Sequence, residues 1–252
     1  MSKITTGTKN YSSSVESTAR QQLYDHFLKC PIPSDQVLSN VGLFLNSKDL
    51  SRILFMDFLF RQIKEVHGVI FDFGTRWGQN MAIFSSCRGI YEPYNRHRKI
   101  VAFDTFSGFP NISPQDGTSD MMEEGSISVT ENYKDYLSRL IDLNEKDNPI
   151  SHIKKHEIVE GDASVEINKY LDMNPHTIVA LAYFDFDLYD PTKVCLNAIK
   201  DRLVKGSVVA FDELNDEDSP GETLALMETI GLNNVQLKRY PYASRVSYFV
   251  VE

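Results

Sequence analysis

Five short apolar segments, each followed directly by glycine or an acidic residue, constrain the fold of this 252-residue chain most strongly. They span residues 69–73, 100–103, 157–159, 178–184 and 207–211. Helix-like segments separate them, for example over residues 164–171 and 191–203. Strands that alternate with helices are typical of a parallel β-sheet covered by helices. We therefore expect an α/β fold with parallel strands in this part of the chain.

The ends of the chain add other expected elements. Helical spacing predicts a helix over residues 17–28 and one or two helices within residues 40–64, whereas residues 1–16 have the composition of a mobile tail. Near the C-terminus, Ser219-Pro220-Gly221-Glu222 has the pattern of a capping box that opens a helix to about Ile230. Residues 235–239 and 245–251 then predict an antiparallel hairpin.

We expect two parts in the chain: a tail and helical preamble over residues 1–64, and one domain over residues 65–252. Within the domain, residues 105–156 form a long connection between two expected strands and contain the acidic stretch DMMEEG. Long connections of this kind are usually functional. Residues 105–156 are therefore predicted to be a substrate-binding or lid insertion.

Composition excludes some classes of function. The chain carries 35 acidic and 26 basic residues, a net charge of −9, whereas nucleic-acid and anionic-membrane binders need a basic field. It has no apolar run of about 18 residues and no charged-then-apolar leader, so we expect a cytoplasmic protein. Cys30, Cys87 and Cys195 are far apart and are expected to be buried, reduced thiols.

The segment GVIFDFGTRWG, residues 68–78, predicts a strand, a tight turn and the start of a helix. Gly74 and Gly78 bracket the turn. Such a turn exposes backbone N–H groups and the positive end of a helix dipole, which suits a nucleotide or nucleoside cofactor. The alternative is that the glycines only reverse the chain direction.

Acidic residues follow four expected strands. Because the carboxyl ends of parallel strands line one crevice, these residues are expected to meet there, although a single acid at such a position is often only a helix cap. Asp104 is placed to accept hydrogen bonds from ribose hydroxyls, and Gly161-Asp162-Ala163 is a small polar turn that could face an adenine ring. The acids are Asp104, Asp162, Asp185 with Asp187, and Asp212 with Glu213.

Three of these carboxylates offer hard oxygen ligands. Asp185, Asp212 and Glu213 suit Mg²⁺ or Mn²⁺ better than zinc, since no histidine or cysteine accompanies them. Asp187 lies two residues beyond Asp185. If it stays outside the metal shell, Asp187 is a candidate general base for a hydroxyl group.

Four motifs together resemble those of class I S-adenosylmethionine-dependent methyltransferases, in particular the macrocin O-methyltransferase-like (TylF-like) group that methylates sugar hydroxyls. The motifs are DFGTRWG, AFDTFSGFP, YFDFDLYDPT and VVAFDEL, and the resemblance covers residues 65–252. It implies a Rossmann-like, seven-stranded sheet that is mostly parallel, with a C-terminal antiparallel hairpin and helices on both faces. It also implies a sugar or nucleotide-sugar substrate, and we expect a homodimer or a larger homo-oligomer because residues 40–64 are apolar.

The resemblance assigns roles to particular residues. Asp187 corresponds to the proposed base, and Asp185, Asp212 and Glu213 correspond to the Mg²⁺ or Mn²⁺ ligands. The residues implied to bind S-adenosylmethionine are Asp72, Phe73, Gly74, Thr75, Gly78, Asp104, Thr105, Gly161, Asp162, Ala163 and Asp185. Two positions depart from the family pattern: Arg76-Trp77 replaces small residues in the glycine turn, and Leu188 stands where some members have histidine.

Other interpretations stay open at this point. The phrase Asp185-Phe186-Asp187 also suits a metal-dependent glycosyltransferase, but that reading does not explain the glycine turn. A non-catalytic binding module would have no evident need for Asp187, and an NAD-dependent oxidoreductase is disfavoured because the turn lacks the GxGxxG spacing. The basic run over residues 96–99 is either solvated loop charge or a contact to the phosphate of a nucleotide-linked substrate.

Overall fold

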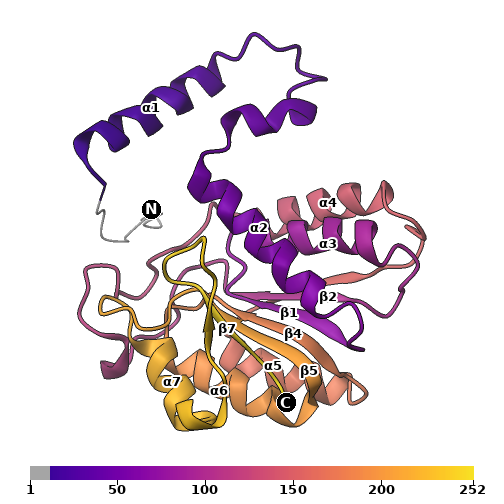
Figure 1. Ribbon diagram of the computed structural model, residues 1–252, viewed down its shortest axis with the longest axis vertical. Helices are drawn as coiled ribbons and strands as arrows, with labels where there is room; N and C mark the ends of the chain where they lie inside the picture. Colours follow the sequence, from indigo (N-terminus) through magenta and orange to yellow (C-terminus); the bar gives the residue numbers. More distant parts are fainter. Residues whose placement is uncertain (1–11) are drawn as a thin grey trace.

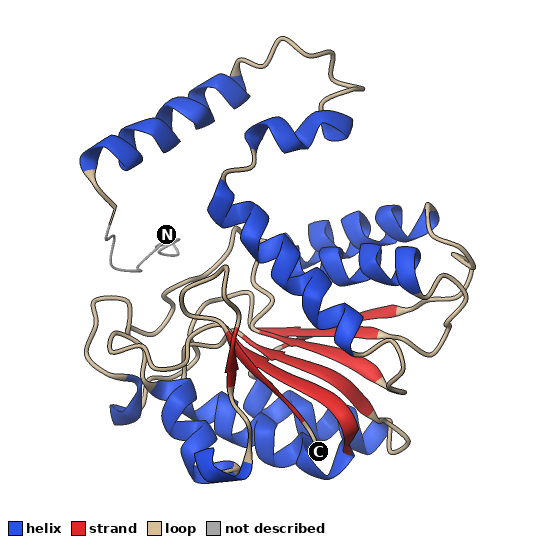
Figure 2. Cartoon of the chain, in the orientation of Figure 1, coloured by secondary structure: helices blue, strands red, loops and turns tan. Residues whose placement is uncertain are grey.

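A seven-stranded sheet forms the centre of the molecule (Figures 1 and 2). The computed structural model describes residues 12–252, and the strand order is β3-β2-β1-β4-β5-β7-β6. The first five strands pair in parallel, and β7 is antiparallel to both β5 and β6. The strands are β1 Val69–Phe73, β2 Ile100–Asp104, β3 His156–Glu160, β4 Val179–Phe184, β5 Leu203–Phe211, β6 Lys238–Arg239 and β7 Ser247–Val250.

Helices cover both faces of the sheet (Figure 1). Helices α2, α3 and α4 lie on one face, and α5, α6 and α7 on the other. The α-helices are α1 Ser14–Leu28, α2 Ser47–Gln62, α3 Gln79–Tyr91, α4 Tyr133–Lys146, α5 Ala163–Met173, α6 Tyr189–Ile199 and α7 Gly221–Thr229. Short 3₁₀ segments are η1 Leu38–Phe44, η2 Pro114–Asp116, η3 Lys200–Arg202 and η4 Leu232–Asn234.

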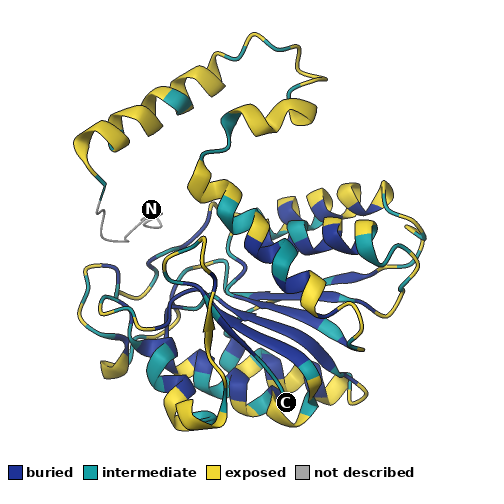
Figure 3. Ribbon diagram, viewed as in Figure 1, coloured by how far each residue is buried: buried dark blue, intermediate teal, exposed yellow. Residues whose placement is uncertain are grey.

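The two helical layers explain why the central strands are apolar throughout. Every residue of β4 is buried, and β1 is buried from Ile70 onward (Figure 3). Side chains alternate between the faces of a strand, so Leu181 and Tyr183 join the core beneath α2 and α3, whereas Ala182 and Phe184 join the core beneath α5 and α6. The sheet is therefore a rigid platform, and its carboxyl edge can hold side chains in fixed positions.

The structure confirms the predicted sheet with its C-terminal antiparallel hairpin and corrects some of its details. Strand β5 begins at Leu203, where the sequence predicted the end of a helix, because α6 ends at Ile199 and a short 3₁₀ turn follows. The predicted capping box is wrong: the N-cap of α7 is Pro220, without a side-chain cap, and Glu222 is buried and accepts a hydrogen bond from the N–H of Phe186. Of the predicted tail, Ser14–Glu16 belongs to α1, and residues 1–11 lie outside the described chain.

The N-terminal helices differ in how they pack. Helix α2 buries Phe55, Met56, Leu59 and Phe60 against the sheet, so its second half belongs to the core. Helix α1 has no buried residue and lies apart from the sheet, connected to α2 through η1 (Figure 1). No helix in the described part of the chain has the length and apolar character needed to cross a membrane. Cys87 and Cys195 are buried free thiols as predicted, but Cys30 is only half-buried.

Candidate active site

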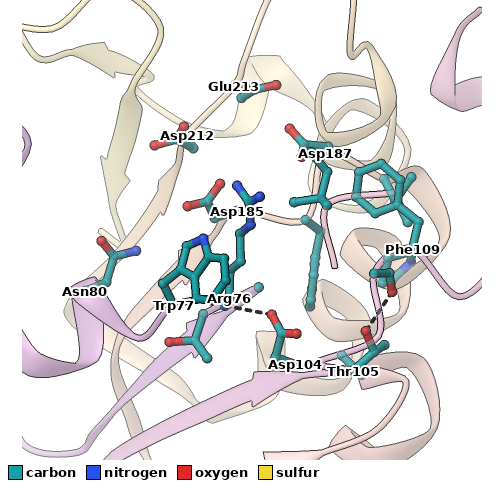
Figure 4. Close-up of a pocket in the computed structure, with 18 of the residues that line it drawn as sticks. Arg76, Trp77, Asn80, Asp104, Thr105, Phe109, Asp185, Asp187, Asp212 and Glu213 are labelled. Atoms are coloured by element: carbon teal, nitrogen blue, oxygen red, sulfur yellow. Dashed lines mark hydrogen bonds between the residues drawn. The ribbon is translucent and has the colours of Figure 1, made fainter. Parts of the chain in front are cut away.

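A cavity of about 320 Å³ opens at the carboxyl edge of the parallel strands (Figure 4). Loops that follow β1, β2, β3, β4 and β5 all contribute to its wall. Most of the predicted site residues line it, and they are Gly74, Thr75, Asp104, Thr105, Gly161, Asp162, Ala163, Asp185, Asp187, Asp212 and Glu213. In Figure 4, Asp104 and Thr105 lie on one side of the cavity, and the other four labelled acids lie on the opposite side.

The glycine turn after β1 packs directly against the end of β4. Gly74 has φ +78°, and a Cβ atom at this position would lie 2.0 Å from the carbonyl oxygen of Asp185. Only glycine fits both the conformation and the space. The turn thereby exposes its backbone to the cavity and leads into α3, whose N-cap is Gly78 in the left-handed conformation.

Asp72, Phe73 and Gly78 are not among the residues that line the cavity. Asp72 is fully buried, where it accepts a hydrogen bond from the hydroxyl of Thr75 (2.5 Å) and one from the amide of Asn80 (3.3 Å). Burial raises the pKa of Asp72 to about 6, although these two hydrogen bonds oppose the increase. Asp72 thus stabilises the conformation of the glycine turn without lining the cavity itself.

Asp104, at the end of β2, is held by two backbone groups. Its Oδ2 atom accepts from the N–H of Arg76 (2.7 Å) and its Oδ1 atom accepts from the N–H of Phe106 (2.6 Å). Burial nevertheless raises the pKa of Asp104. Because each carboxylate oxygen has a further lone pair, Asp104 retains capacity to accept hydrogen bonds from a ligand in the cavity.

The turn after β3 forms the wall beside Asp104. Gly161, Asp162 and Ala163 all line the cavity, and Asp162 is also the N-cap of α5, where its Oδ1 atom accepts from the N–H of Ser164 (2.8 Å). The capping role explains the orientation of Asp162. Its second carboxylate oxygen is not used by the cap.

Two arginines neutralise the acids at the ends of β4 and β5. Arg52 of α2 contacts Oδ2 of Asp185 (2.6 Å) and Oδ1 of Asp212 (2.9 Å). Arg245, from the loop before β7, forms an ion pair with Glu213 and lies 3.9 Å from Asp212. Even so, burial and the charge of Asp212 raise the pKa of Asp185 to about 7.

Asp187 has an unusual backbone conformation and environment. Its φ angle is +60°, in the left-handed region that residues other than glycine adopt uncommonly, although aspartate and asparagine do so more often than most. The side chain is buried and shares a hydrogen bond with Glu213. Burial and the charge of Glu213 raise the pKa of Asp187 well above its ordinary value. Asp187 therefore retains its proton to a higher pH than an isolated carboxyl group does.

The acids present the oxygen ligands that Mg²⁺ and Mn²⁺ prefer. Within residues 12–252, however, no three histidine, cysteine, aspartate or glutamate side chains are arranged so that they could hold one metal ion. Arg52 and Arg245 occupy the space between these carboxylates instead. The donor chemistry thus fits a divalent cation, whereas the present side-chain arrangement does not.

Comparison with solved structures identifies the family. The crystal structure of CalS11, a calicheamicin methyltransferase, is 39% identical in sequence, with a TM-score of 0.93 and coverage of 96% of this chain and 94% of that chain. This chain belongs to the class I sugar O-methyltransferases. An apo structure of CalS11, described as a TDP-rhamnose 3′-O-methyltransferase in calicheamicin biosynthesis, is 37% identical with a TM-score of 0.85, and 96% of each chain is covered.

A more distant structure agrees on the fold alone. The O-methyltransferase NovP is 15% identical, with a TM-score of 0.58 over 79% of each chain. Neither a protein-family model nor a curated protein matches this methyltransferase chain. The family assignment decides against the glycosyltransferase, the oxidoreductase and the non-catalytic module considered above.

The structure adds site residues that the sequence motifs of this methyltransferase did not reveal. Arg52, Asn80 and Arg245 line the cavity, and Glu222 lies buried behind it with its Oε1 atom 2.9 Å from the N–H of Phe186. Arg52 and Arg245 belong to segments far from the motifs, so no local pattern marked them. Helix α2 also carries Lys48, Asp49, Asp57 and Arg61, so the charge of Arg52 did not distinguish it from its neighbours.

Two other segments noted in the sequence lie at opposite edges of the sheet. Trp77, which replaces a small residue of the family pattern in the glycine turn, lines the cavity and contacts Tyr133 edge-on, with ring centroids 4.7 Å apart. Arg96, His97 and Lys99 line a second cavity at the amino ends of the strands, opposite the candidate active site. The interpretation of this basic run as a phosphate contact is therefore wrong for a substrate bound at the candidate active site.

Proposed function

We propose that this enzyme methylates a hydroxyl group of a sugar that is linked to a nucleoside diphosphate. The observation that carries the proposal is the likeness over nearly the full length of both chains to CalS11, which acts on TDP-rhamnose. The cavity is consistent with such a reaction, because it combines a nucleoside-type pocket beside Asp104 with a cluster of acids beside Asp187.

The residues around the glycine turn fit S-adenosylmethionine, the methyl donor of this class. Among the described residues, Nε and Nη2 of Arg76 are buried without a hydrogen-bond partner, although Arg76 lines the cavity. Unpaired buried donors of a cation are costly and call for an anionic partner. We assign Arg76 to the carboxylate of the methionine part, Asp104 to the ribose hydroxyls, and Gly161, Asp162 and Ala163 to the adenine.

The chemistry needs a proton acceptor on the substrate side of the cavity. When bound, the cofactor supplies a methyl group on a positively charged sulfur atom. Asp187 takes up the proton of the acceptor hydroxyl, because it is a buried carboxyl group at the cavity wall, beside the acids at the ends of β4 and β5. Glu213 acts on Asp187 through their shared hydrogen bond and so influences the pH at which Asp187 becomes a base.

We also propose that Asp185, Asp212 and Glu213 hold Mg²⁺ or Mn²⁺ after the side chains rearrange. A bound divalent cation supplies positive charge that lowers the pKa of a nearby sugar hydroxyl. Glu213 supports this assignment, since its buried Oε2 atom accepts no hydrogen bond from an N–H or hydroxyl donor of the described residues. The carboxylates come from the ends of two adjacent strands, so they are already close to one another.

A homo-oligomer is the third part of the proposal. Helix α1 buries none of its residues, and Val15, Leu28, Leu38 and Leu43 in α1 and η1 are 76%, 62%, 82% and 65% exposed. Apolar side chains on this scale favour contact with another protein surface, and we propose a second copy of this chain. Deletion of residues 12–44 should then reduce the mass measured by light scattering to that of a monomer, and an unchanged mass would contradict this.

The decisive experiment has two stages. Calorimetric titration with S-adenosylhomocysteine should show micromolar binding to the wild type and weaker binding to Asp104→Ala. Incubation with S-adenosylmethionine and TDP-rhamnose, followed by mass spectrometry, should then give a product heavier by one CH₂ group. Binding without any product would confirm the cofactor and reject this nucleotide-sugar, whereas the absence of binding would reject the assigned cofactor site.

A further inference from the structure

The guanidinium group of Arg52 uses all three of its nitrogen atoms within the candidate site. Nη2 donates to Oδ2 of Asp185 (2.6 Å), Nη1 donates to Oδ1 of Asp212 (2.9 Å), and Nε donates to Oδ1 of Asn80 (3.2 Å). Asp212 also accepts from the hydroxyl of Tyr183 (2.6 Å). Arg52 therefore bridges the ends of β4 and β5 with good hydrogen-bond geometry.

We propose that Arg52 is a built-in counter-ion of the metal site, and that it and a divalent cation exclude one another. The proposal rests on the proposed function, since it concerns Asp185 and Asp212 as metal ligands. Arg52 is a positioning residue: it keeps the two carboxylates paired and close together until a metal ion takes its place.

Charge is the first argument for exclusion. Asp185, Asp187, Asp212 and Glu213 lie together at one end of the cavity, and mutual repulsion would separate carboxylates that lacked a cation between them. Arg52 supplies that cation on the side of Asp185 and Asp212, and Arg245 does so beside Glu213. A divalent ion between the same two aspartates would repel the guanidinium, so Arg52 has to withdraw.

The bonding arrangement is the second argument. The oxygen atoms that Arg52 contacts belong to the two aspartates proposed to share the metal ion. In the present arrangement the guanidinium lies between them, and the acids of the described chain do not converge into a metal site. Departure of this one side chain would free an oxygen on each aspartate.

The surroundings of Arg52 allow such a movement. Arg52 lies near the N-terminal end of α2, before the buried residues Phe55, Met56, Leu59 and Phe60 that anchor the helix. Lys48, Asp49 and Leu50 on the preceding turn are exposed, and the side chain of Arg52 is 31% exposed. The helix can therefore stay in place while the flexible arginine side chain moves.

Asn80 connects this exchange to the glycine turn. Its Oδ1 atom accepts from Arg52, and its Nδ2 atom donates to Oδ1 of Asp72 (3.3 Å), which in turn holds Thr75. Withdrawal of Arg52 removes one of the two bonds that orient Asn80. Metal binding and the cofactor turn are thus linked through Arg52, Asn80 and Asp72.

The test is titration with Mn²⁺, followed by the electron paramagnetic resonance signal of free Mn²⁺. Arg52→Met should bind Mn²⁺ at least about tenfold more tightly than the wild type, because the ion no longer displaces two charge-assisted hydrogen bonds. Arg61→Met is the matched control: it is on the same helix, forms an ion pair with Asp57 across one turn, away from the candidate site, and should leave the affinity unchanged. Arg52→Lys keeps the positive charge and should bind Mn²⁺ with an affinity between those of the wild type and Arg52→Met. It is the second variant in case Arg52→Met fails to fold.

Each outcome decides one point. Equal Mn²⁺ affinity in the wild type and Arg52→Met, or weaker affinity in the variant, would overturn the exclusion and leave the metal site standing. No Mn²⁺ binding to either protein would overturn both the exclusion and the metal assignment. Titration with S-adenosylhomocysteine tests the methyltransferase assignment separately, so the failures can be told apart.

Discussion

The carbonyl oxygen of Asp185 lies where the side chain of residue 74 would have to be. A Cβ atom on Gly74 would be 2.0 Å from that oxygen, so the proposed cofactor turn and the acidic end of β4 are in direct backbone contact. The contact brings the turn after β1 against the end of the neighbouring strand, and the proposed donor and acceptor sites share one wall. A change on either side should therefore affect the other.

Gly74→Ala should disrupt this contact. Both the φ angle of +78° and the overlap with Asp185 oppose the substitution, so we expect the loss of S-adenosylhomocysteine binding and a fall in the free energy of unfolding. Gly125→Ala is the matched control, because Gly125 has the same φ angle of +78° and no heavy atom within 4 Å of its added Cβ. It should cost about 1 kcal/mol. Equal losses in the two variants, measured by urea unfolding, would contradict the steric argument.

Asp187→Asn should remove the proton acceptor and leave the cofactor site unchanged. We expect kcat to fall by about 10²–10⁴-fold, with affinity for S-adenosylhomocysteine nearly unchanged. Asp190→Asn, at an exposed position three residues further on, should keep full activity. A kcat of Asp187→Asn within a few-fold of the wild-type value would remove Asp187 from the role of base.

The same residue sets the expected pH dependence of the reaction. Burial and Glu213 raise the pKa of Asp187, so the base loses its proton only at higher pH than an ordinary carboxyl group. The acidic limb of the kcat/KM profile should accordingly lie above the range of free carboxylic acids, and Glu213→Gln, which removes the neighbouring charge, should move it to lower pH. An acidic limb near the ordinary carboxyl range in the wild type would contradict this.

Asp72 should make the protein less stable as the pH rises. Its pKa is about 6 in the folded protein against an ordinary value of 3.8, so the folded state binds the proton more tightly than the unfolded chain. The stabilisation is complete below the unfolded pKa and is lost as pH rises to the folded pKa, an effect of about 3 kcal/mol. In urea unfolding, the difference between wild type and Asp72→Asn should change by most of this amount, about 2 kcal/mol, between pH 4 and pH 7. Exposed Asp135→Asn should show no such change.

Arg76→Met tests the carboxylate assignment by comparing two ligands. Affinity for S-adenosylhomocysteine should fall about tenfold or more, because a charge-assisted contact is lost. Affinity for methylthioadenosine, which lacks the amino acid part, should not change. Arg96→Met, at the opposite edge of the sheet, serves as the control. Equal weakening of both ligands would show that Arg76 acts on the nucleoside or on the turn itself.

Much of the fold follows from local patterns. The strands around Phe73, Phe103 and Phe184 could be located because apolar runs that stop at glycine or acid are a short-range signal. The errors arose where two signals compete. Leu203 continues an apolar helical pattern, but in the structure it is the first residue of β5. Glu222 has the spacing of a capping residue, but it is buried and accepts a hydrogen bond from the backbone N–H of Phe186.

The candidate site, like the fold, could be predicted only in part from the sequence. Asp104, Asp185 and Asp212 end strands of one sheet, so their meeting at one edge follows from the topology. The buried position of Asp72 did not follow, because it depends on how α3 brings Asn80 over the turn. The pattern of acids at strand ends does not indicate which buried side chains stabilise the loops of the site.

The sequence by itself determined the order of elements, the glycine turn, the acids at the strand ends and the motifs of a methyltransferase family. Each of these depends on residues within a few positions of one another. Only the tertiary structure decided that Arg52 bridges Asp185, 133 positions later in the chain, and Asp212, 160 positions later. The physical reason is that such ion pairs depend on how α2 packs across the sheet, and a residue's charge carries no information about which distant partner that packing will bring to it.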